Sequence, residues 1–294
     1  MKSRTYQTSK AFRIALEQRL KNYAFETNVD LQEIRRKVAF ERFLSRLFKN
    51  EDSHWVLKGG YAMELRISLA RATRDIDLVM RKPYLRPNFW NDKGQEMLKM
   101  LREYAAVDIG DFFEYIIGEP MHDLENAPYG GARYPIDAQI DGRSFVKFHI
   151  DVSSGDSVEE PYEYLNGNPW LAFANIPAVS FPSICQEEQF SEKLHAYTLP
   201  RRDRENSRVR DLIDMVLLID QGTINETKLL HCIQKTFRIR NTHSLPIKLP
   251  TPPAFWKTPF ADMATSCQID PSIDLQFEKL CAFCHEILAQ TQLA

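Results

Sequence analysis

Residues 73–79 read TRDIDLV, a short stretch in which two aspartates flank one isoleucine in an otherwise apolar strand. Successive side chains of a strand point to opposite faces, so Asp75 and Asp77 share one face while Ile76 and Leu78 share the other. Neighbouring carboxylates repel each other, and a divalent cation would relieve that repulsion. The alternative interpretation is a solvent-facing edge strand with two ordinary surface acids.

The composition is that of a globular protein. The chain has 294 residues, of which 44% are apolar and 27% charged, and this length predicts two domains or one large domain with helical additions. The net charge of −2 gives no global sign of a nucleic-acid binder, so local charge matters more. Five scattered cysteines fit a reducing compartment. We find neither a signal-peptide core nor an 18-residue apolar run, and therefore expect a cytoplasmic protein that has no membrane partner.

The segments before residue 120 alternate between helical and extended patterns. Two helices come first, the second starting at the capping signature Asp30-x-x-Glu33. A strand over 54–58 then leads through two glycines into a helical pattern over 61–70. The D-x-D strand, a Pro- and Asn-rich loop (83–94), a helix over about 92–106 and a strand over 112–118 follow.

Residues 130–152 predict a β-hairpin with a turn at Asp141-Gly142. Asp151 ends its second strand. A sheet that placed Asp151 beside the D-x-D pair would create a three-carboxylate cluster suited to Mg²⁺, whereas a plain strand-terminal Asp would only cap a turn. Period-two alternation predicts two faces for the second strand: Val146, Phe148, Ile150 and Val152 on one, and Phe145, Lys147, His149 and Asp151 on the other.

The second part of the chain is mainly helical. A connector with short strands (157–184) precedes helical periodicity from residue 186, which a proline-rich loop (245–259) interrupts. The C-x-x-C at 281–284 lies in an amphipathic helix and is interpreted as a packed, reduced helix face instead of a zinc site. The order of elements predicts an α+β (α/β) fold, with a mixed sheet flanked by helices in residues 1–185 and a helical domain in 186–294.

Two further stretches carry candidate chemistry. Gly59 and Gly60, between a strand and a helix, let backbone N–H groups approach an anion, and Lys58 adds a positive charge; a simple tight turn is the alternative. The stretch SEKLHAYTLPRRDRENSRVRDLIDM (191–215) is locally basic and suits a polyphosphate or an RNA backbone, or else is a solvated loop before a core helix. Its candidate RNA-binding residues are Arg201, Arg202, Arg204 and Arg208.

The order LKGG, TRDIDLV, HIDVSSGD, SEKLHA, RVRDLIDM resembles the AbiEii/AbiGii family of nucleotidyltransferase toxins, which includes the MenT toxins and belongs to the DNA polymerase β-like superfamily. The likeness covers roughly residues 54–220. It implies that Asp75 and Asp77 bind Mg²⁺ or Mn²⁺, with Asp151 as a third carboxylate. Its remaining implied residues are the NTP-binding Lys58, Gly59, Gly60 and Arg74, the phosphate-holding Lys193 and the functional acid Asp211.

The resemblance also implies a reaction. A nucleotide would pass from an NTP to an acceptor hydroxyl, with the 3′ end of tRNA as the acceptor, in a toxin paired with an AbiEi-like antitoxin. Two departures weaken the implied substrate contacts: the superfamily often has Gly-Ser where this chain has Gly59-Gly60, and His195 follows Lys193 by only two residues. AMP addition to a protein hydroxyl and a non-catalytic RNA- or partner-binding module are the alternatives.

Overall fold

The computed structural model describes residues 6–50, 52–81, 90, 92, 94–121, 124, 127–156, 158–201 and 205–289. The chain forms two compact units that alternate along the sequence. The division at residues 185 and 186 stays a prediction, and most of the predicted loop over 83–94 lies outside the described residues. We name the two compact units the sheet unit (Met1–Tyr61, Ala72–Gly155 and Glu163–Ser183) and the helical unit (Ala62–Arg71, Asp156–Tyr162 and Ile184–Ala294).

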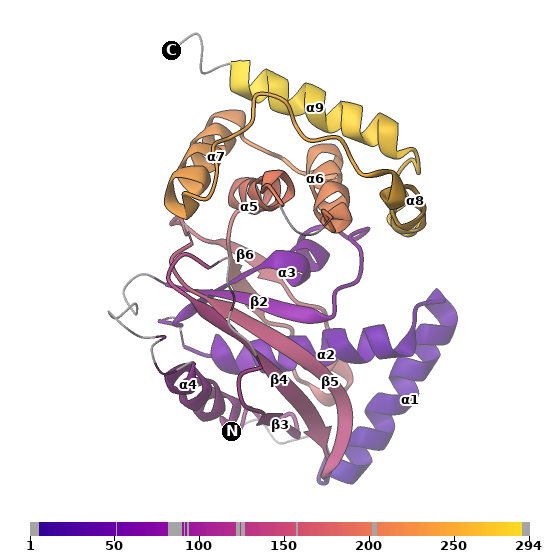
Figure 1. Ribbon diagram of the computed structural model, residues 1–294. Helices are drawn as coiled ribbons and strands as arrows, with labels where there is room; N and C mark the ends of the chain where they lie inside the picture. The colour runs from indigo at the N-terminus through magenta and orange to yellow at the C-terminus, as the bar shows by residue number, and fades with distance from the viewer. Residues whose placement is uncertain are drawn as a thin grey trace. The chain divides into compact units, whose positions relative to one another are not determined.

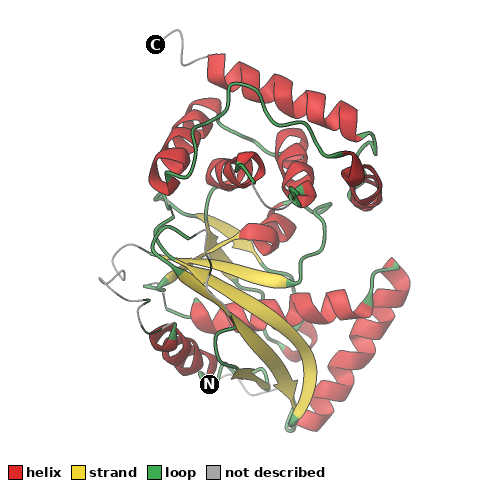
Figure 2. Ribbon diagram, in the orientation of Figure 1, coloured by secondary structure: helices red, strands yellow, loops and turns green. Residues whose placement is uncertain are grey.

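The sheet unit is built on a seven-stranded mixed sheet with the order β3-β4-β5-β2-β1-β7-β6 (Figures 1 and 2). β2 runs parallel to β5 and β1 parallel to β7, while the other neighbours are antiparallel. This confirms the predicted α+β class. The strands are β1 (Trp55–Lys58), β2 (Asp75–Met80), β3 (Phe113–Ile117), β4 (Gly131–Ile140), β5 (Arg143–Ser153), β6 (Glu163–Asn166) and β7 (Ser180–Ser183).

Helices cover one face of this sheet. α2 (Leu31–Leu47) packs on β5, α4 (Gln95–Ala105) packs on β3, and α1 (Ser9–Thr27) packs against α2. The predicted cap is present, because the Asp30 side chain accepts the Glu33 N–H at 3.0 Å. The ring of Phe148 meets that of Phe40 edge-on, 4.8 Å between centroids. Because β5 side chains alternate, its polar residues point away from α2.

The predicted hairpin is confirmed, with one irregularity. Asp141 and Gly142 form the turn with φ of 59° and 65°, the left-handed region that such turns require. A β-bulge between Ala138 and Gln139 then shifts the pairing of β4 with β5. The bulge explains why Phe145, predicted on the polar face, is buried, whereas the alternation from Val146 to Val152 is as predicted.

A buried ion cluster joins α2 to the segment before β3. Asp111 is fully buried, and its carboxylate receives hydrogen bonds from Arg42 Nε at 2.7 Å and from Arg46 at 2.7 and 2.9 Å. Burial opposes the charge of Asp111, but the two guanidinium groups outweigh it and lower its pKa. The pattern of apolar residues in α2 does not predict this cluster. Charged residues are expected on the exposed face of a helix, but Arg42 and Arg46 are buried here.

The helical unit has its own apolar core. Trp256, Phe260 and Leu280 are among its buried side chains, and Cys284 joins them, as expected for a packed C-x-x-C helix. The residues of α3 (Gly59–Arg66) up to Tyr61 belong to the sheet unit, and those from Ala62 belong to the helical unit. The helix ends four residues earlier than the helical pattern predicted over 61–70. The other helices of this unit are α5 (Gln186–Thr198), α6 (Val209–Gln221), α7 (Glu226–Arg240), α8 (Lys257–Ser266) and α9 (Ile273–Ala289), with a short 3₁₀ turn at Ala254–Trp256. A second 3₁₀ turn, at Ala172–Ala174, lies in the sheet unit.

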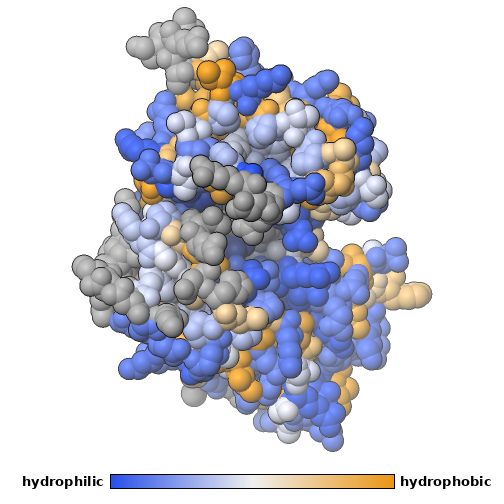
Figure 3. All heavy atoms as spheres, in the orientation of Figure 1, coloured by the Kyte–Doolittle hydropathy of each residue, from blue (hydrophilic) through white to orange (hydrophobic). Residues whose placement is uncertain are grey.

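The described surface is mostly hydrophilic in the view of Figure 3, with scattered apolar side chains. None of the described helices combines the length and the apolar character that crossing a bilayer requires. Phe255, in the proline-rich loop, is 49% exposed, while its neighbour Trp256 is buried.

Candidate active site

The D-x-D strand lies inside the sheet. β2 pairs with β1 on one side and β5 on the other, so the interpretation of TRDIDLV as a solvent-facing edge strand is wrong. The register sets Asp77 between Lys58 and Asp151, and it sets Asp75 beside His149. Paired residues of neighbouring strands point to the same face. Three carboxylates therefore share one face of the sheet, as the sequence predicted if Asp151 came alongside.

Asp77 has an environment that opposes the ionised form of its carboxyl group. Burial and the nearby charges of Asp151 and Asp75 raise its pKa to about 7, while Lys58 and the Gly60 N–H act in the opposite direction. The Gly60 N–H donates to Asp77 Oδ2 at 3.3 Å. A carboxyl group that resists ionisation in this way is typical of a functional site, where a ligand of opposite charge supplies the missing compensation.

Arg133 on β4 is a site residue that the sequence did not single out. Its Nε and Nη2 donate to the two oxygens of Asp151, both at 2.7 Å, and Nη2 also lies 3.4 Å from Asp75 Oδ2. The hydrogen bonds to Asp151 raise the pKa of Arg133. His149 Nδ1 lies 3.5 Å from Asp75 Oδ1. Arg133 thus adds a permanent cation to the carboxylate cluster, besides Lys58 next to Asp77.

The glycine turn at the end of β1 is shaped by this cluster. Gly59 has φ of +67°, and a Cβ added there would lie 2.0 Å from Asp77 Oδ2. A Cβ on Gly60 would lie 2.6 Å from Thr73 Oγ1. Position 59 therefore requires glycine both for its backbone conformation and for its close approach to the aspartate. The serine that the superfamily often carries at position 60 would meet Thr73 here.

Metal binding rests on the donor chemistry of these acids. The described part of the chain contains no group of three or more His, Cys, Asp or Glu side chains arranged to hold one metal ion. Within the cluster, Arg133 engages both oxygens of Asp151. Asp75 and Asp77 nevertheless offer hard oxygen donors from one face, and burial together with the charges of Asp151 and Asp75 raises the pKa of Asp77 despite the nearby Lys58.

The predicted residues of the helical unit form a second cluster. Lys193 Nζ lies 2.6 Å from Asp214 Oδ2 and 3.5 Å from Asp211 Oδ1. Arg71 binds both oxygens of Asp214, at 3.0 and 2.8 Å. Burial opposes the charge of Lys193, but the carboxylates of Asp214 and Asp211 outweigh it and raise its pKa. Arg208 lies 3.6 Å from Asp211.

The predicted site residues therefore fall into two sets. Lys58, Gly59, Gly60, Arg74, Asp75, Asp77 and Asp151 belong to the sheet unit, and Lys193, Arg201, Arg208 and Asp211 belong to the helical unit. Arg202 and Arg204 lie outside the described residues. Arg71 and Asp214, which complete the Lys193 cluster, were not predicted as site residues. The R-D-x-x-D spacing is the signal for Asp214, because it places both acids one helical turn apart.

Comparisons with known proteins identify the family of the chain and similar folds. The family model described as "Nucleotidyl transferase AbiEii toxin, Type IV TA system" matches residues 42–280. MenT4, a nucleotidyltransferase toxin from Mycobacterium tuberculosis H37Rv, has a similar fold, with a TM-score of 0.55 at 14% identity over 93% of this chain and 97% of that chain. JHP933 from Helicobacter pylori matches with a TM-score of 0.42 at 17% identity over 88% of this chain and 98% of that chain. No curated protein sequence matches the chain.

Proposed function

Because the chain belongs to the AbiEii family of nucleotidyltransferase toxins of type IV toxin–antitoxin systems, we propose that it transfers a nucleotide from an NTP to the 3′-terminal hydroxyl of a tRNA, which blocks translation. The observation that carries this proposal is the carboxylate face of β2 and β5 beside a glycine turn. Nucleotidyl transfer needs charge neutralisation and positioning above all, and this face would supply both through the divalent cation that its carboxylates hold.

Asp75 and Asp77 would hold the Mg²⁺ or Mn²⁺, since both present oxygen donors on one face. A divalent cation bound there would neutralise the triphosphate and stabilise the leaving pyrophosphate. Asp151 would join as third ligand on exchanging Arg133 for the cation, because its two oxygens are otherwise engaged. Asp151 would then help to accept the proton of the attacking hydroxyl.

The glycine turn would receive the triphosphate. The backbone N–H groups at the start of α3 would bind phosphate oxygens, the Gly60 N–H on exchanging Asp77 Oδ2 for a phosphate oxygen. Lys58, directly before the turn, would add positive charge. Lys193 would bind nucleotide phosphates and Asp211 would act as the acid of the R-D-x-x-D motif; their mutual distance of 3.5 Å supports a joint role.

Two kinds of partner follow from this proposal. The stretch with Arg201, Arg202, Arg204 and Arg208 would contact the RNA backbone, because clustered basic side chains neutralise phosphates. A cognate AbiEi-like antitoxin would oppose the toxin, as the type IV system of the family description requires a partner.

The test incubates purified protein with total tRNA, Mg²⁺ and each labelled NTP in turn. We expect label on RNA with the wild type and none with Asp75→Asn/Asp77→Asn, whose side chains keep their shape but lose their charge. Digestion with RNase or protease identifies the acceptor. Label that survives RNase and is lost with protease would refute the tRNA acceptor, and equal labelling by the double variant would refute the roles of the two acids.

A further inference from the structure

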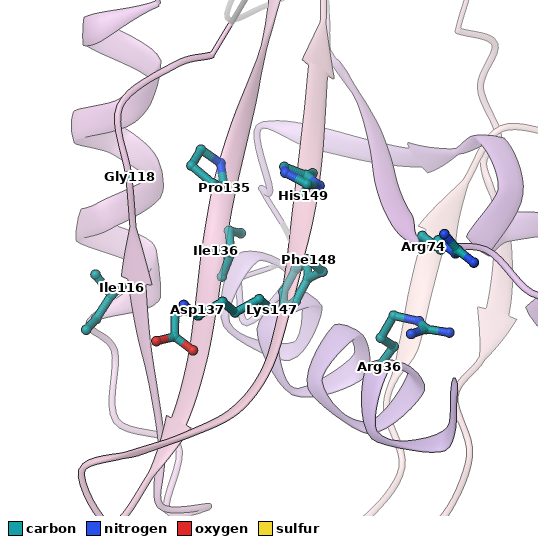
Figure 4. A pocket seen from close by; sticks show the side chains of 10 residues that line it. All are labelled: Arg36, Arg74, Ile116, Gly118, Pro135, Ile136, Asp137, Lys147, Phe148 and His149. Atoms are coloured by element: carbon teal, nitrogen blue, oxygen red, sulfur yellow. The ribbon is translucent and has the colours of Figure 1, made fainter. Parts of the chain in front are cut away.

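A cavity of about 530 Å³ opens in the sheet unit beside β5 (Figure 4). Its volume lies within the range of small-ligand sites, roughly 300–1,000 Å³. Figure 4 shows lining side chains on β3, β4 and β5 together with two arginines on the other side of β5, one of them on α2. The residues that matter for recognition are Arg36, Arg74, Ile116, Pro135, Asp137, Lys147 and His149.

The cavity exists because β2 is shorter than β5. β2 begins at Asp75, which stands opposite His149, so the part of β5 before His149 has no pairing with β2 in the described register. Arg36 and Arg74 line the cavity on that side. Lys147 and His149 continue the polar face that ends in Asp151, so the cavity is continuous with the carboxylate cluster through His149, 3.5 Å from Asp75.

The charge of this cavity favours an anion. Arg36, Arg74 and Lys147 are permanent cations, and Asp137 is the one carboxylate among the lining residues. Asp137 is itself engaged, since it accepts hydrogen bonds from Ser144 at 2.6 Å and Gln139 at 2.9 Å. Arg36 Nε is buried and has no hydrogen-bond partner in the described structure. A buried donor of this kind gains most from a phosphate oxygen.

The position of the cavity in the sheet relates it to the attacking hydroxyl of the proposed reaction. The strand order places β1 and its glycine turn on one side of β2, and β5, β4 and β3 on the other. In phosphoryl and nucleotidyl transfer, the attacking and leaving oxygens lie roughly in line on opposite sides of the phosphorus. With the triphosphate at the glycine turn, the attacking hydroxyl must therefore approach from the side of β5.

We propose that this cavity binds the 3′-terminal nucleotides of the acceptor RNA, with Arg36, Arg74 and Lys147 contacting backbone phosphates. Ile116, which is 58% exposed, and Pro135 add an apolar wall suited to a ribose or base. The inference rests on the proposed function and deepens it. It assigns Arg74 to the acceptor in place of the NTP.

The test measures RNA binding without NTP or metal, so that it does not depend on transfer. The probe is a 5′-fluorescein-labelled RNA hairpin with a single-stranded 3′ end, titrated by fluorescence anisotropy at several KCl concentrations. The variant is Arg74→Gln/Lys147→Gln. The matched control, Arg143→Gln/Lys99→Gln, removes the same charge from exposed positions of the same unit that do not line the cavity.

We expect the variant to bind the hairpin about tenfold more weakly at 150 mM KCl, and its salt slope to fall by about 0.7 for each lost phosphate contact. The control should bind within about twofold of the wild type, since a general charge effect would weaken both proteins alike. Equal weakening of variant and control overturns the proposal. So does a variant that binds a fluorescent ATP analogue more weakly and RNA normally, which would make the cavity a triphosphate site. If the wild type transfers no nucleotide to RNA while the variant alone loses hairpin binding, the cavity assignment stands and the proposed function fails.

Discussion

Replacing Asp77 with asparagine should stabilise the protein while it abolishes transfer. The carboxyl group of Asp77 has its pKa raised from the ordinary 3.8 to about 7, so the folded chain holds it less readily in the charged form than the unfolded chain does. Above pH 7 the charged carboxylate therefore costs folding free energy. Asparagine removes the charge, and its side-chain oxygen can still accept the Gly60 N–H.

The size of this effect follows from the two pKa values. Each tenfold change in proton affinity corresponds to about 1.4 kcal/mol, so the difference between 3.8 and about 7 sets a ceiling of about 4 kcal/mol at pH 8. The sign is opposite to that of a salt-bridged acid: the cost is complete above the folded pKa and disappears as the pH falls toward the unfolded pKa. We expect the variant to be about 2–4 kcal/mol more stable at pH 8, and this advantage to fall by about half at pH 5.5.

Urea unfolding of the wild type and Asp77→Asn at the two pH values measures the advantage directly. Glu114→Gln, an exposed carboxylate on β3, is the matched control and should change the free energy of unfolding by less than about 0.5 kcal/mol. A variant no more stable than the wild type at pH 8 would refute the electrostatic reasoning. An advantage that does not change with pH would show that it arises from packing instead of from charge.

Three further substitutions, with Gly142→Ala as a control for the first, test the local geometry by urea unfolding. Gly59→Ala should lower the free energy of unfolding by more than about 2 kcal/mol, because a left-handed backbone and a Cβ 2.0 Å from Asp77 Oδ2 act together. Gly142→Ala measures the backbone contribution alone, since Gly142 has φ of +65° and its added Cβ would meet nothing within 4 Å; it should cost about 1 kcal/mol. Asp214→Asn should cost about 3 kcal/mol, since it leaves two buried cations short of a charge, and a loss below about 1 kcal/mol would contradict their pairing. Asp111→Asn should cost a similar amount, about 3 kcal/mol, because two buried arginines lose their counter-ion.

The carboxylate face could be predicted from the sequence because it depends on local rules. Alternation along TRDIDLV places Asp75 and Asp77 together, and the Asp141-Gly142 turn predicts the hairpin that ends in Asp151. The sheet order could not be predicted, since it depends on pairings between distant strands. Alternation alone did not exclude an edge strand.

Arg133 shows why the rest of the site was missed. Counted outward from the Asp141-Gly142 turn, a regular hairpin would place Ala132 opposite Asp151. The bulge near Ala138 shifts the register by one residue, and Arg133 stands there instead. The residue types near Ala138 do not predict the bulge, because its position depends on how the whole sheet packs. A one-residue shift changes which side chains meet, and so it decides the composition of the site.

Arg133 and Lys58 also explain how three carboxylates fold side by side. Arg133 neutralises Asp151 with two short hydrogen bonds, and Lys58 partly compensates Asp77. Burial and the neighbouring acids still outweigh Lys58, so the negative charge of Asp77 is only partly compensated, and we propose that a cation binds there. The charge that weakens the fold at Asp77 is thus the charge that a divalent ion requires. The stability that Asp77→Asn is expected to gain and the transfer that it is expected to lose would therefore measure the same electrostatic arrangement.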